Sequence, residues 1–398
     1  MNRIMINRWK YTAFYAVVCR ELERIVSRRL YLGVCIILPL FSLFFMSTIF
    51  GNGQMENIPI GIVDQDQSAL SRQIVREVAA VPTFRVQRYF VNPADARKAM
   101  QGREIYGYLL VPDNFEIDAL TGHEAVLSYY YHYALLSVGA EVRGAFETVL
   151  RTLSLSPVIM QASALGIGER QISSFLLPIR KSSHLLFNPD LDYSVYLSQP
   201  YFYVMLQVIV LLTTVYVLGS EIKFHTAEGW LAVAGNDMLT AVAGKLFPYT
   251  VIFSLMSILA NWVMFGCMHI PFSCSFTPLI LSAILLVLAS QALALFIFSL
   301  FPAISIIISI VSMIGSLGAT LCGVTFPVTS MYTPVYYASY LFPIRHFIEI
   351  SHTLLYGNYG LAYSWQNYCV LLAFLLPPLL LLPRLKTAIL CHKYEDIE

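Results

Sequence analysis

The chain has 398 residues, of which 57% are hydrophobic and 12% are charged, and its formal net charge is +1. Soluble globular proteins carry about 25% charged residues, so this composition excludes an ordinary soluble domain and indicates a multi-pass membrane protein. The net charge itself decides nothing, because in a membrane protein the position of each charge matters more than the sum.

Residues 1–29 predict an amphipathic helix on the cytoplasmic side. Apolar residues recur there at helical spacing, whereas Arg20, Glu21, Glu23 and Arg24 fall mainly on the other face. The apolar positions are Tyr11, Phe14, Tyr15, Val18, Leu22, Ile25 and Val26. Such a helix either lies in the membrane interface or packs on a partner as a plain cytoplasmic helix.

Six apolar stretches follow, and none of them contains Asp, Glu, Lys or Arg. They occupy residues 30–50, 199–220, 246–268, 278–300, 303–326 and 365–383. Each approaches or exceeds the roughly 20 residues that cross a bilayer as a helix. The first is too long for a signal-peptide core of about 7–15 residues and no Ala-x-Ala site follows it, so we expect an uncleaved anchor.

The absence of charge inside the spans bears on function. Ion-coupled transporters and pumps usually keep ionisable groups within the membrane. The sequence therefore argues against a secondary transporter, and energy for any transport is expected to enter from outside the membrane segment.

Lysines and arginines near the span ends predict the orientation. Residues 1–29 carry seven of them, the segment 221–245 carries Lys223 and Lys245, and the tail 384–398 carries Arg384, Lys386 and Lys393. The loop 267–277 has none and the loop 327–364 has only Arg345. Both termini are therefore expected in the cytoplasm.

Residues 51–198 predict an α/β domain outside the membrane. Strand-like runs at 58–63, 84–90, 105–111 and 126–133 alternate with helix-like runs at 68–80, 93–101, 112–120 and 135–155, a pattern typical of mixed α/β domains. Asp64 and Asp66 are expected to shape a turn between strand and helix. His123 and His132 lie on either side of a strand, and we expect no metal site and no catalytic residues. Cys267 and Cys274 either pair across their short loop or remain free thiols.

Several motifs together resemble those of ABC-2 type exporter permeases, in the subgroup with a large outer domain after the first span. In the segment 221–245 and the start of the next span, the matching residues are Glu221, Thr226, Glu228, Leu231, Gly244, Lys245, Pro248 and Tyr249. Elsewhere they are Val63, Asp64, Asp66, Ser68, Ser71, Arg72, the run 108–115, Phe187, Asn188, Pro189, Ser194, Tyr196, Pro200, Phe326, Pro327, Leu341 and Pro343. His225 and Phe342 depart from the family pattern, which has a small glycine and an asparagine there.

The resemblance implies a transport subunit that is not itself an enzyme and binds no cofactor. A P-loop needs Gly-x-x-x-x-Gly-Lys-Ser/Thr, and around Gly244 and Lys245 the motif fails at Leu239 and Leu246. ATP and Mg²⁺ would therefore be bound by a separate cytoplasmic ABC ATPase. Other implied partners are a second permease copy, identical or paralogous, membrane lipid and a periplasmic adaptor, with no nucleic acid. The implied location is a bacterial inner membrane.

The resemblance also implies roles for individual residues. A short helix at about 226–234 would dock on the ATPase, with Trp230 and Leu231 as apolar anchors and with Glu221, Lys223, Thr226 and Glu228 as polar contacts. Gln207, Asn261 and Gln291 would either line the substrate path or bridge helices. The loop 327–364 would form short re-entrant helices that close the outer end, with Pro327, Tyr337, Pro343 and Arg345 as gate residues.

The implied function is outward transport of amphiphilic or drug-like molecules. The alternative is a membrane-anchored receptor or interaction protein that acts through residues 51–198 and transports nothing. Six spans exceed what an anchor needs. The segment 221–245 distinguishes the two hypotheses, because only the exporter requires it to bind an ATPase.

Overall fold

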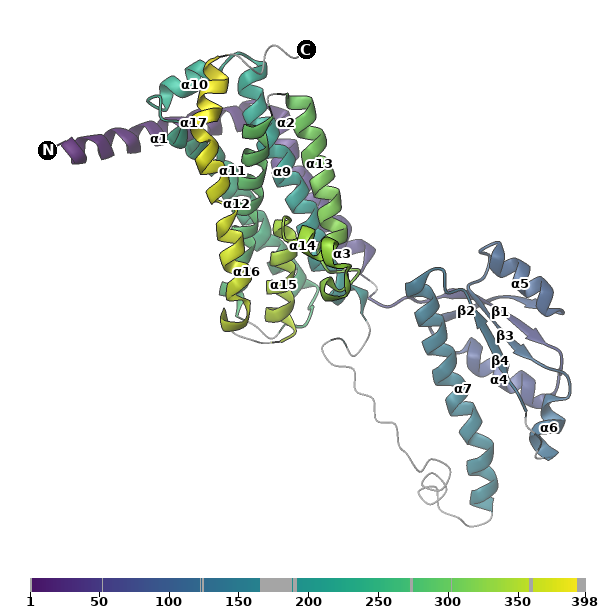
Figure 1. The fold of residues 1–398 in the computed structure, drawn as a ribbon. Coiled ribbons are helices and arrows are strands. Elements are labelled where there is room, and N and C mark those ends of the chain that lie inside the picture. The colour runs from purple at the N-terminus through teal and green to yellow at the C-terminus, as the bar shows by residue number, and fades with distance from the viewer. Residues whose placement is uncertain are drawn as a thin grey trace. The chain divides into compact units, whose positions relative to one another are not determined.

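The structure is a computed structural model that describes residues 2–51, 53–121, 123, 125–164, 188, 192–272, 275–301, 303–357 and 361–391. The chain divides into two compact units (Figure 1). One, the membrane unit, joins Met1–Gly53 to Phe187–Glu398, and the other, the α/β domain, comprises Gln54–Leu186. Phe187, Pro189, Cys274 and Lys393, which the sequence analysis singled out, lie outside the described residues.

The membrane unit is helical, and six of its described helical runs are long and apolar enough to cross a membrane. This confirms the expected multi-pass helical membrane protein. The runs are Arg29–Ile49, Ser194–Lys223, Met238–Cys267, Phe276–Leu300, Ile304–Leu321 and Tyr363–Leu390. Their elements are α2 (Arg29–Leu32), η1 (Gly33–Ile37), α3 (Leu38–Ile49), η2 (Ser194–Ser198), α9 (Gln199–Lys223), α11 (Met238–Trp262), η3 (Val263–Cys267), α12 (Phe276–Leu300), α13 (Ile304–Leu321), α16 (Leu361–Ala373) and α17 (Leu376–Leu390).

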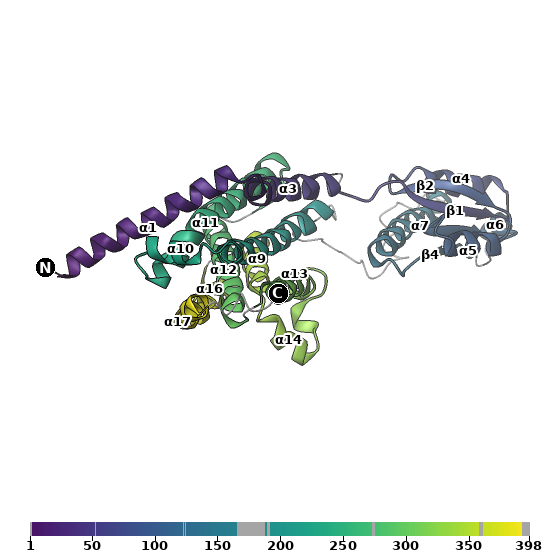
Figure 2. The same ribbon diagram turned by 90° about the horizontal axis from the view of Figure 1, so that it is seen from above.

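Shorter helices lie at the two ends of this bundle. Figure 1 shows α1 (Asn2–Ser27) and α10 (Ala227–Val233) at one end, and α14 (Thr333–Ser339) and α15 (Pro343–Leu355) toward the other. A 3₁₀ turn, η4 (Val328–Ser330), precedes α14. Seen along the bundle in Figure 2, α1 extends well beyond the other helices. We call these the α10 end and the α14 end.

Helix α9 is the centre of the membrane unit. Within its apolar window 78% of the residues are buried inside the unit, against 22% for α13. Side chains on nearly every face of α9 are enclosed, among them Tyr203, Val210, Val215 and Val217, each at 0% exposure. A helix that is apolar all round is expected to be enclosed in this way, so α9 contacts most of its neighbours while α13 keeps an exposed face.

Helix α11 begins at Met238, eight residues before the third expected span, and so includes Lys245. The apolar stretch alone placed this lysine outside the span, because a charged side chain in an apolar helix is costly unless it is paired. Lys245 is paired with two carboxylates, which explains how the helix extends past it.

The α/β domain holds a four-stranded sheet in the order β2-β1-β3-β4. The strands are β1 (Ile58–Asp64), β2 (Phe84–Phe90), β3 (Gly107–Val111) and β4 (Ser128–Tyr131), and the helices are α4 (Ala69–Ala79), α5 (Pro93–Gln101), α6 (Phe115–Thr121) and α7 (Leu136–Ala164). The central strand β1 is parallel to β2 and β3, and β4 is antiparallel to β3. The expected mixed α/β architecture is therefore confirmed.

Both faces of the sheet are covered. On one face, side chains of β1 and β3 such as Ile60 and Leu109 pack with Val78 of α4 and Phe146 of α7. On the other, Val63 and Phe90 pack with Ala96 and Ala99 of α5. Alternate residues of a strand point to opposite faces, so one apolar strand supplies both cores.

Asp64 and Asp66 shape the turn that follows β1. The Ser71 hydroxyl donates to Asp64 Oδ2 at 2.8 Å, and the backbone N–H of Gln67 donates to Asp64 Oδ1 at 3.0 Å. Asp66 Oδ2 accepts from the N–H of Glu116 at 3.1 Å. Among the described residues no cluster of His, Cys, Asp and Glu is arranged to hold a metal ion.

Candidate functional site

Seven side chains from separate segments meet at the α10 end and form what we call the Glu221 cluster. Helix α1 contributes Arg20, Glu21 and Arg24; α9 contributes Glu221; the turn before α10 contributes Thr226; and α11 contributes Lys245 and Tyr249. The cluster joins the four elements α1, α9, α10 and α11 at the α10 end of the long helices.

Glu221 is the centre of this cluster and is completely buried. Arg20 binds it with both terminal nitrogens, Nη1 to Oε1 at 2.8 Å and Nη2 to Oε2 at 3.0 Å. The Lys245 ammonium donates to Oε1 at 2.7 Å, and Arg24 and Thr226 donate to the same carboxylate. A buried carboxylate is tolerated only when it is paired and hydrogen-bonded, and here four side chains supply donors.

Lys245 is also completely buried and bridges two carboxylates. Besides Glu221 it donates to Glu21 Oε2 at 2.7 Å, while the Tyr249 hydroxyl donates to Glu21 Oε1 at 2.8 Å. Breaking a buried pair by removing one partner costs about 3–5 kcal/mol, because it leaves the other charge unpaired. The cluster therefore makes each of its helices dependent on the others.

The sequence of α1 explains how three of these groups reach the cluster. Residues 20, 21 and 24 lie on one side of a helix, because side chains three and four positions apart share a face. Close packing brings that face to α11: a Cβ added at Gly244 would lie only 2.9 Å from Cβ of Val17. Burial is the largest single effect on Arg24 and acts to lower its pKa, but the hydrogen bond to the Glu221 carboxylate and the negative charges of Glu221 and Glu21 together raise the pKa of Arg24.

This placement corrects the expected sidedness of α1. Arg20, Glu21 and Arg24 were expected on a polar face turned away from the membrane, yet Glu21 is completely buried against α11. The residues turned outward include Tyr15, Leu22 and Val26, with 69%, 45% and 72% exposure. Opposite charges make this possible, since they pair with one another inside the protein, whereas an apolar surface remains suited to the membrane interface.

Helix α10 turns its largest side chains inward. Trp230 and Leu231 are each 1% exposed and belong to the core that also includes Leu218, Ala241 and Phe298. The Trp230 indole N–H donates to the carbonyl of Ala241 at 3.2 Å, and Lys245 Nζ lies 5.4 Å from the Trp230 ring centre.

The expected anchors Trp230 and Leu231 therefore stabilise α10 on its own chain and present no surface to a partner. The exposed residues of this segment instead include Lys223, Phe224, Glu228 and Val233. Of the polar contacts expected from the sequence, Lys223 and Glu228 face outward, whereas Glu221 lies inside the cluster with the partly buried Thr226. A seven-residue helix carries too few turns for its sequence pattern to show which face is buried.

Three polar residues expected along the substrate path, Gln207, Asn261 and Gln291, are 2%, 1% and 3% exposed. Gln291 Oε1 accepts from the Thr250 hydroxyl at 2.7 Å, which bridges α12 and α11. Gln207 Nε2 lies 3.3 Å from the position of a Cβ added at Gly318, between α9 and α13. The structure places all three between helices of the same chain.

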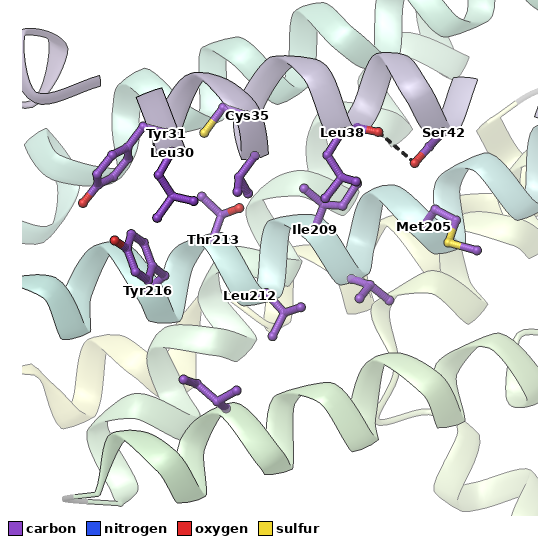
Figure 3. A pocket seen from close by; sticks show the side chains of 13 residues that line it. Leu30, Tyr31, Cys35, Leu38, Ser42, Met205, Ile209, Leu212, Thr213 and Tyr216 are labelled. Carbon is purple, nitrogen blue, oxygen red and sulfur yellow. Dashed lines mark hydrogen bonds between the residues drawn. The ribbon is translucent and has the colours of Figure 1, made fainter. Parts of the chain in front are cut away.

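A groove of about 480 Å³ lies between the first long helix, α9 and α13 (Figure 3). The groove was not predictable from the sequence, because its residues carry no charge and come from three distant segments. They are Leu30, Tyr31, Val34, Cys35, Leu38, Ser42, Met205, Val208, Ile209, Leu212, Thr213, Tyr216 and Ile308. Gln207, Asn261 and Gln291 are not among them.

At the α14 end, Arg345 connects α14 to α15. Its side chain is 2% exposed, and Nη1 donates to Ser339 Oγ at 2.7 Å and to the carbonyl of Tyr336 at 3.3 Å. Its guanidinium carbon lies 3.7 Å from the ring centre of Tyr340 and 4.9 Å from that of Tyr336. The expected short helices are present in this loop. The other three expected gate residues lie in different surroundings: Pro343 is buried at the start of α15, Pro327 precedes η4, and Tyr337 is 66% exposed.

Comparison with known proteins gives one result that covers most of the chain. The family model described as ABC-2 family transporter protein matches residues 29–382, a range that begins with the first long helix, takes in the α/β domain and ends inside the sixth long helix. No curated protein and no solved structure matches the chain significantly. The residues of α1 precede the matched range. On the strength of a match from the first long helix to the sixth, this chain belongs to the ABC-2 family of transporter proteins.

Proposed function

We propose that this chain is the membrane-spanning permease subunit of an ATP-driven ABC-2 type exporter. It moves amphiphilic or drug-like molecules outward across a bacterial inner membrane, with energy from a separate cytoplasmic ATPase. Membership of the family supports a transport subunit that works with such an ATPase. The direction, the substrate and the identity of the partners are parts of the proposal.

The observation that carries the proposal is the Glu221 cluster. A partner that pushes on α10 acts on Thr226 and on Trp230, which contact Glu221 and Lys245 respectively. Those two residues belong to α9 and α11. Because both are completely buried and share a hydrogen bond of 2.7 Å, displacement of α10 reaches two membrane helices directly. A receptor that transports nothing has no need of this connection.

In this proposal α10 and both termini lie on the cytoplasmic side, and the α/β domain lies outside. The exposed Phe224, Glu228 and Val233 form the docking surface for the ATPase in place of Trp230 and Leu231. Two permease copies, identical or paralogous, enclose the path. The α/β domain is the contact for a periplasmic adaptor.

The test is co-purification of the tagged full chain from its native membranes, with mass spectrometry of the associated proteins. We expect a stoichiometric ABC ATPase with the wild-type chain. The double variant Glu228→Lys, Val233→Asp changes two exposed residues of α10 and should reduce the bound ATPase about tenfold, which corresponds to about 1.4 kcal/mol of binding free energy.

The matched control is Asp113→Lys, a charge reversal at an exposed position of the α/β domain. It should leave the bound ATPase unchanged. If no ATPase co-purifies with the wild-type chain in several mild detergents, the exporter proposal fails and the anchored receptor takes its place. If the α10 variant retains its ATPase, docking occurs elsewhere.

A further inference from the structure

We propose that the groove between the first long helix, α9 and α13 binds an uncharged apolar molecule that carries a hydrogen-bond acceptor, and that Thr213 donates the hydrogen bond. This inference rests on the proposed function in one respect, since it treats the groove as the substrate site of the permease. It narrows the substrate class from amphiphilic or drug-like molecules to neutral ones.

The lining of the groove is uncharged. None of the groove residues is Asp, Glu, Lys, Arg or His. The groove belongs to helices that are long and apolar enough to cross a membrane, and an unpaired charge at that depth is costly. A cationic or anionic ligand would have no opposite charge to pair with among the lining residues. A neutral ligand needs no such partner. The volume of about 480 Å³ falls within the range of about 300–1,000 Å³ typical of small-molecule sites.

The Thr213 hydroxyl is the buried polar group of the groove that lacks a partner among the described residues. Thr213 is 3% exposed and lines the groove, and its Oγ1 has no hydrogen-bond partner among the described residues. Buried hydroxyls normally have a partner. The next residue, Thr214, is equally enclosed, and its hydroxyl donates to the carbonyl of Val210 at 2.7 Å. The same helix thus satisfies one hydroxyl by itself and leaves the groove-facing one for a ligand.

The opposite wall of the groove has an irregular backbone. The groove residues Val34 and Cys35 belong to η1, a π-helical segment of the first long helix. Single π-helical turns inside helices are frequent at functional sites. Figure 3 shows Thr213 of α9 rising toward the helix that carries Leu30 and Cys35. The π-helical segment η1 and the unpaired Thr213 hydroxyl therefore line the same groove.

The experiment measures equilibrium binding of two radiolabelled probes to the purified full chain in detergent. Progesterone is neutral and carries carbonyl acceptors, and tetraphenylphosphonium is apolar but permanently cationic. We expect saturable binding of progesterone and at least tenfold weaker binding of tetraphenylphosphonium. Thr213→Val keeps the shape and removes the donor, so it should weaken progesterone binding about fivefold, the usual worth of one neutral hydrogen bond. Ile308→Trp places a ring at the partly exposed α13 edge of the groove and should abolish binding.

Two matched controls separate the groove from general effects on folding. Thr214→Val removes the neighbouring hydroxyl, which does not line the groove, and Ile306→Trp adds a ring on α13 at an exposed position outside it. Both should bind progesterone like the wild type, and all four variants should elute as the wild type does in size-exclusion chromatography.

The proposal is overturned if progesterone does not bind saturably, or if Thr213→Val and Ile308→Trp bind it unchanged. Equal binding of tetraphenylphosphonium in the same groove overturns the neutral class. If Ile308→Trp dissociates a dimer in size-exclusion chromatography, the groove is filled by a second copy. Binding requires no ATPase, so a failure here leaves the co-purification result untouched, and a missing ATPase leaves the binding site standing.

Discussion

The Lys245 ammonium donates to the Glu221 carboxylate at 2.7 Å, although the two residues are 24 positions apart and belong to different membrane helices. Neither side chain is exposed. Glu221 also accepts hydrogen bonds from arginines of α1, and Lys245 also donates to Glu21 of α1. One ion pair thus connects the N-terminal helix to the helices on both sides of α10.

The first prediction concerns Lys245. Lys245→Met should destabilise the chain by about 3–5 kcal/mol, because among the described residues Glu21 then keeps only Tyr249 and a distant Arg24, at 3.8 Å, as partners. The double variant Glu21→Gln, Lys245→Met removes the stranded charge as well and should recover a large part of the loss. Thermal unfolding of the purified chain in detergent measures both. A double variant that is no more stable than Lys245→Met alone would show that the unpaired Glu21 charge is not the cause of the loss.

The sequence predicted the six apolar helices and the mixed α/β domain because both follow from local patterns. A bilayer demands about 20 apolar residues for each crossing, and strands such as β1 and β3 are short apolar runs bounded by turn residues. The turn shaped by Asp64 and Asp66 was predictable for the same reason. These features depend on residues close together in the chain.

The Glu221 cluster was not predictable in the same way. Glu21 and Lys245 are 224 positions apart, and nothing in the periodicity of α1 shows that its charges pair with those of another helix. Lys245 also lies one residue before the third apolar stretch, so a search for charges inside the stretches does not include it. The inward turn of Trp230 is a second such case, because the core that receives it comes from α9, α11 and α12.

A second prediction tests the close contact of α13 with α9. A Cβ added at Gly315 would lie 2.9 Å from Cγ2 of Val208, a short and stiff side chain. Gly315→Ala should therefore destabilise the chain by about 1–3 kcal/mol through overpacking, and Val208→Ala in the same chain should restore most of it. Gly33→Ala is the control, because nothing lies within 4 Å of its added Cβ. Equal unfolding temperatures for Gly315→Ala and Gly33→Ala would contradict the contact.

A third prediction concerns Arg345. Arg345→Lys keeps the charge but loses the planar group that stacks on Tyr340 and donates to Ser339. Because this side chain connects α14 to α15, hydrogen–deuterium exchange should become faster in α14. The loss of the desolvated cation–π contact should lower the stability of this connection by about 2 kcal/mol.

The control for Arg345 is Glu349→Gln. The Glu349 carboxylate lies 3.7 Å from Arg345 Nη2 and its side chain is 38% exposed, and exposed ion pairs are worth only about 0–1 kcal/mol. Exchange in α14 should hardly change in this variant. The same acceleration in both would mean that charge pairing, and not the stacking on Tyr340, holds α14.

The fourth prediction concerns the point where the chain leaves α3 and returns to α9. Gly53 has a φ of +67°, and its carbonyl accepts from the N–H of Tyr193 at 2.8 Å. A Cβ added there would lie 2.8 Å from Cγ of Asp192, whose Oδ1 accepts from the N–H of Ser194 at 2.6 Å. The glycine is therefore required twice, by its backbone conformation and by the neighbouring carboxylate.

Gly53→Ala should break this connection. The left-handed conformation alone costs a residue with a Cβ about 1–2 kcal/mol, and the contact with Asp192 adds to it. Asp192→Ala in the same chain removes the contact but not the strain, so the double variant should recover only part of the loss. Hydrogen–deuterium exchange at Tyr193 and the unfolding temperature measure the effect. Gly144→Ala, with nothing within 4 Å of its added Cβ, serves as control. Full recovery in the double variant would show that the carboxylate alone, and not the backbone, demands glycine at this position.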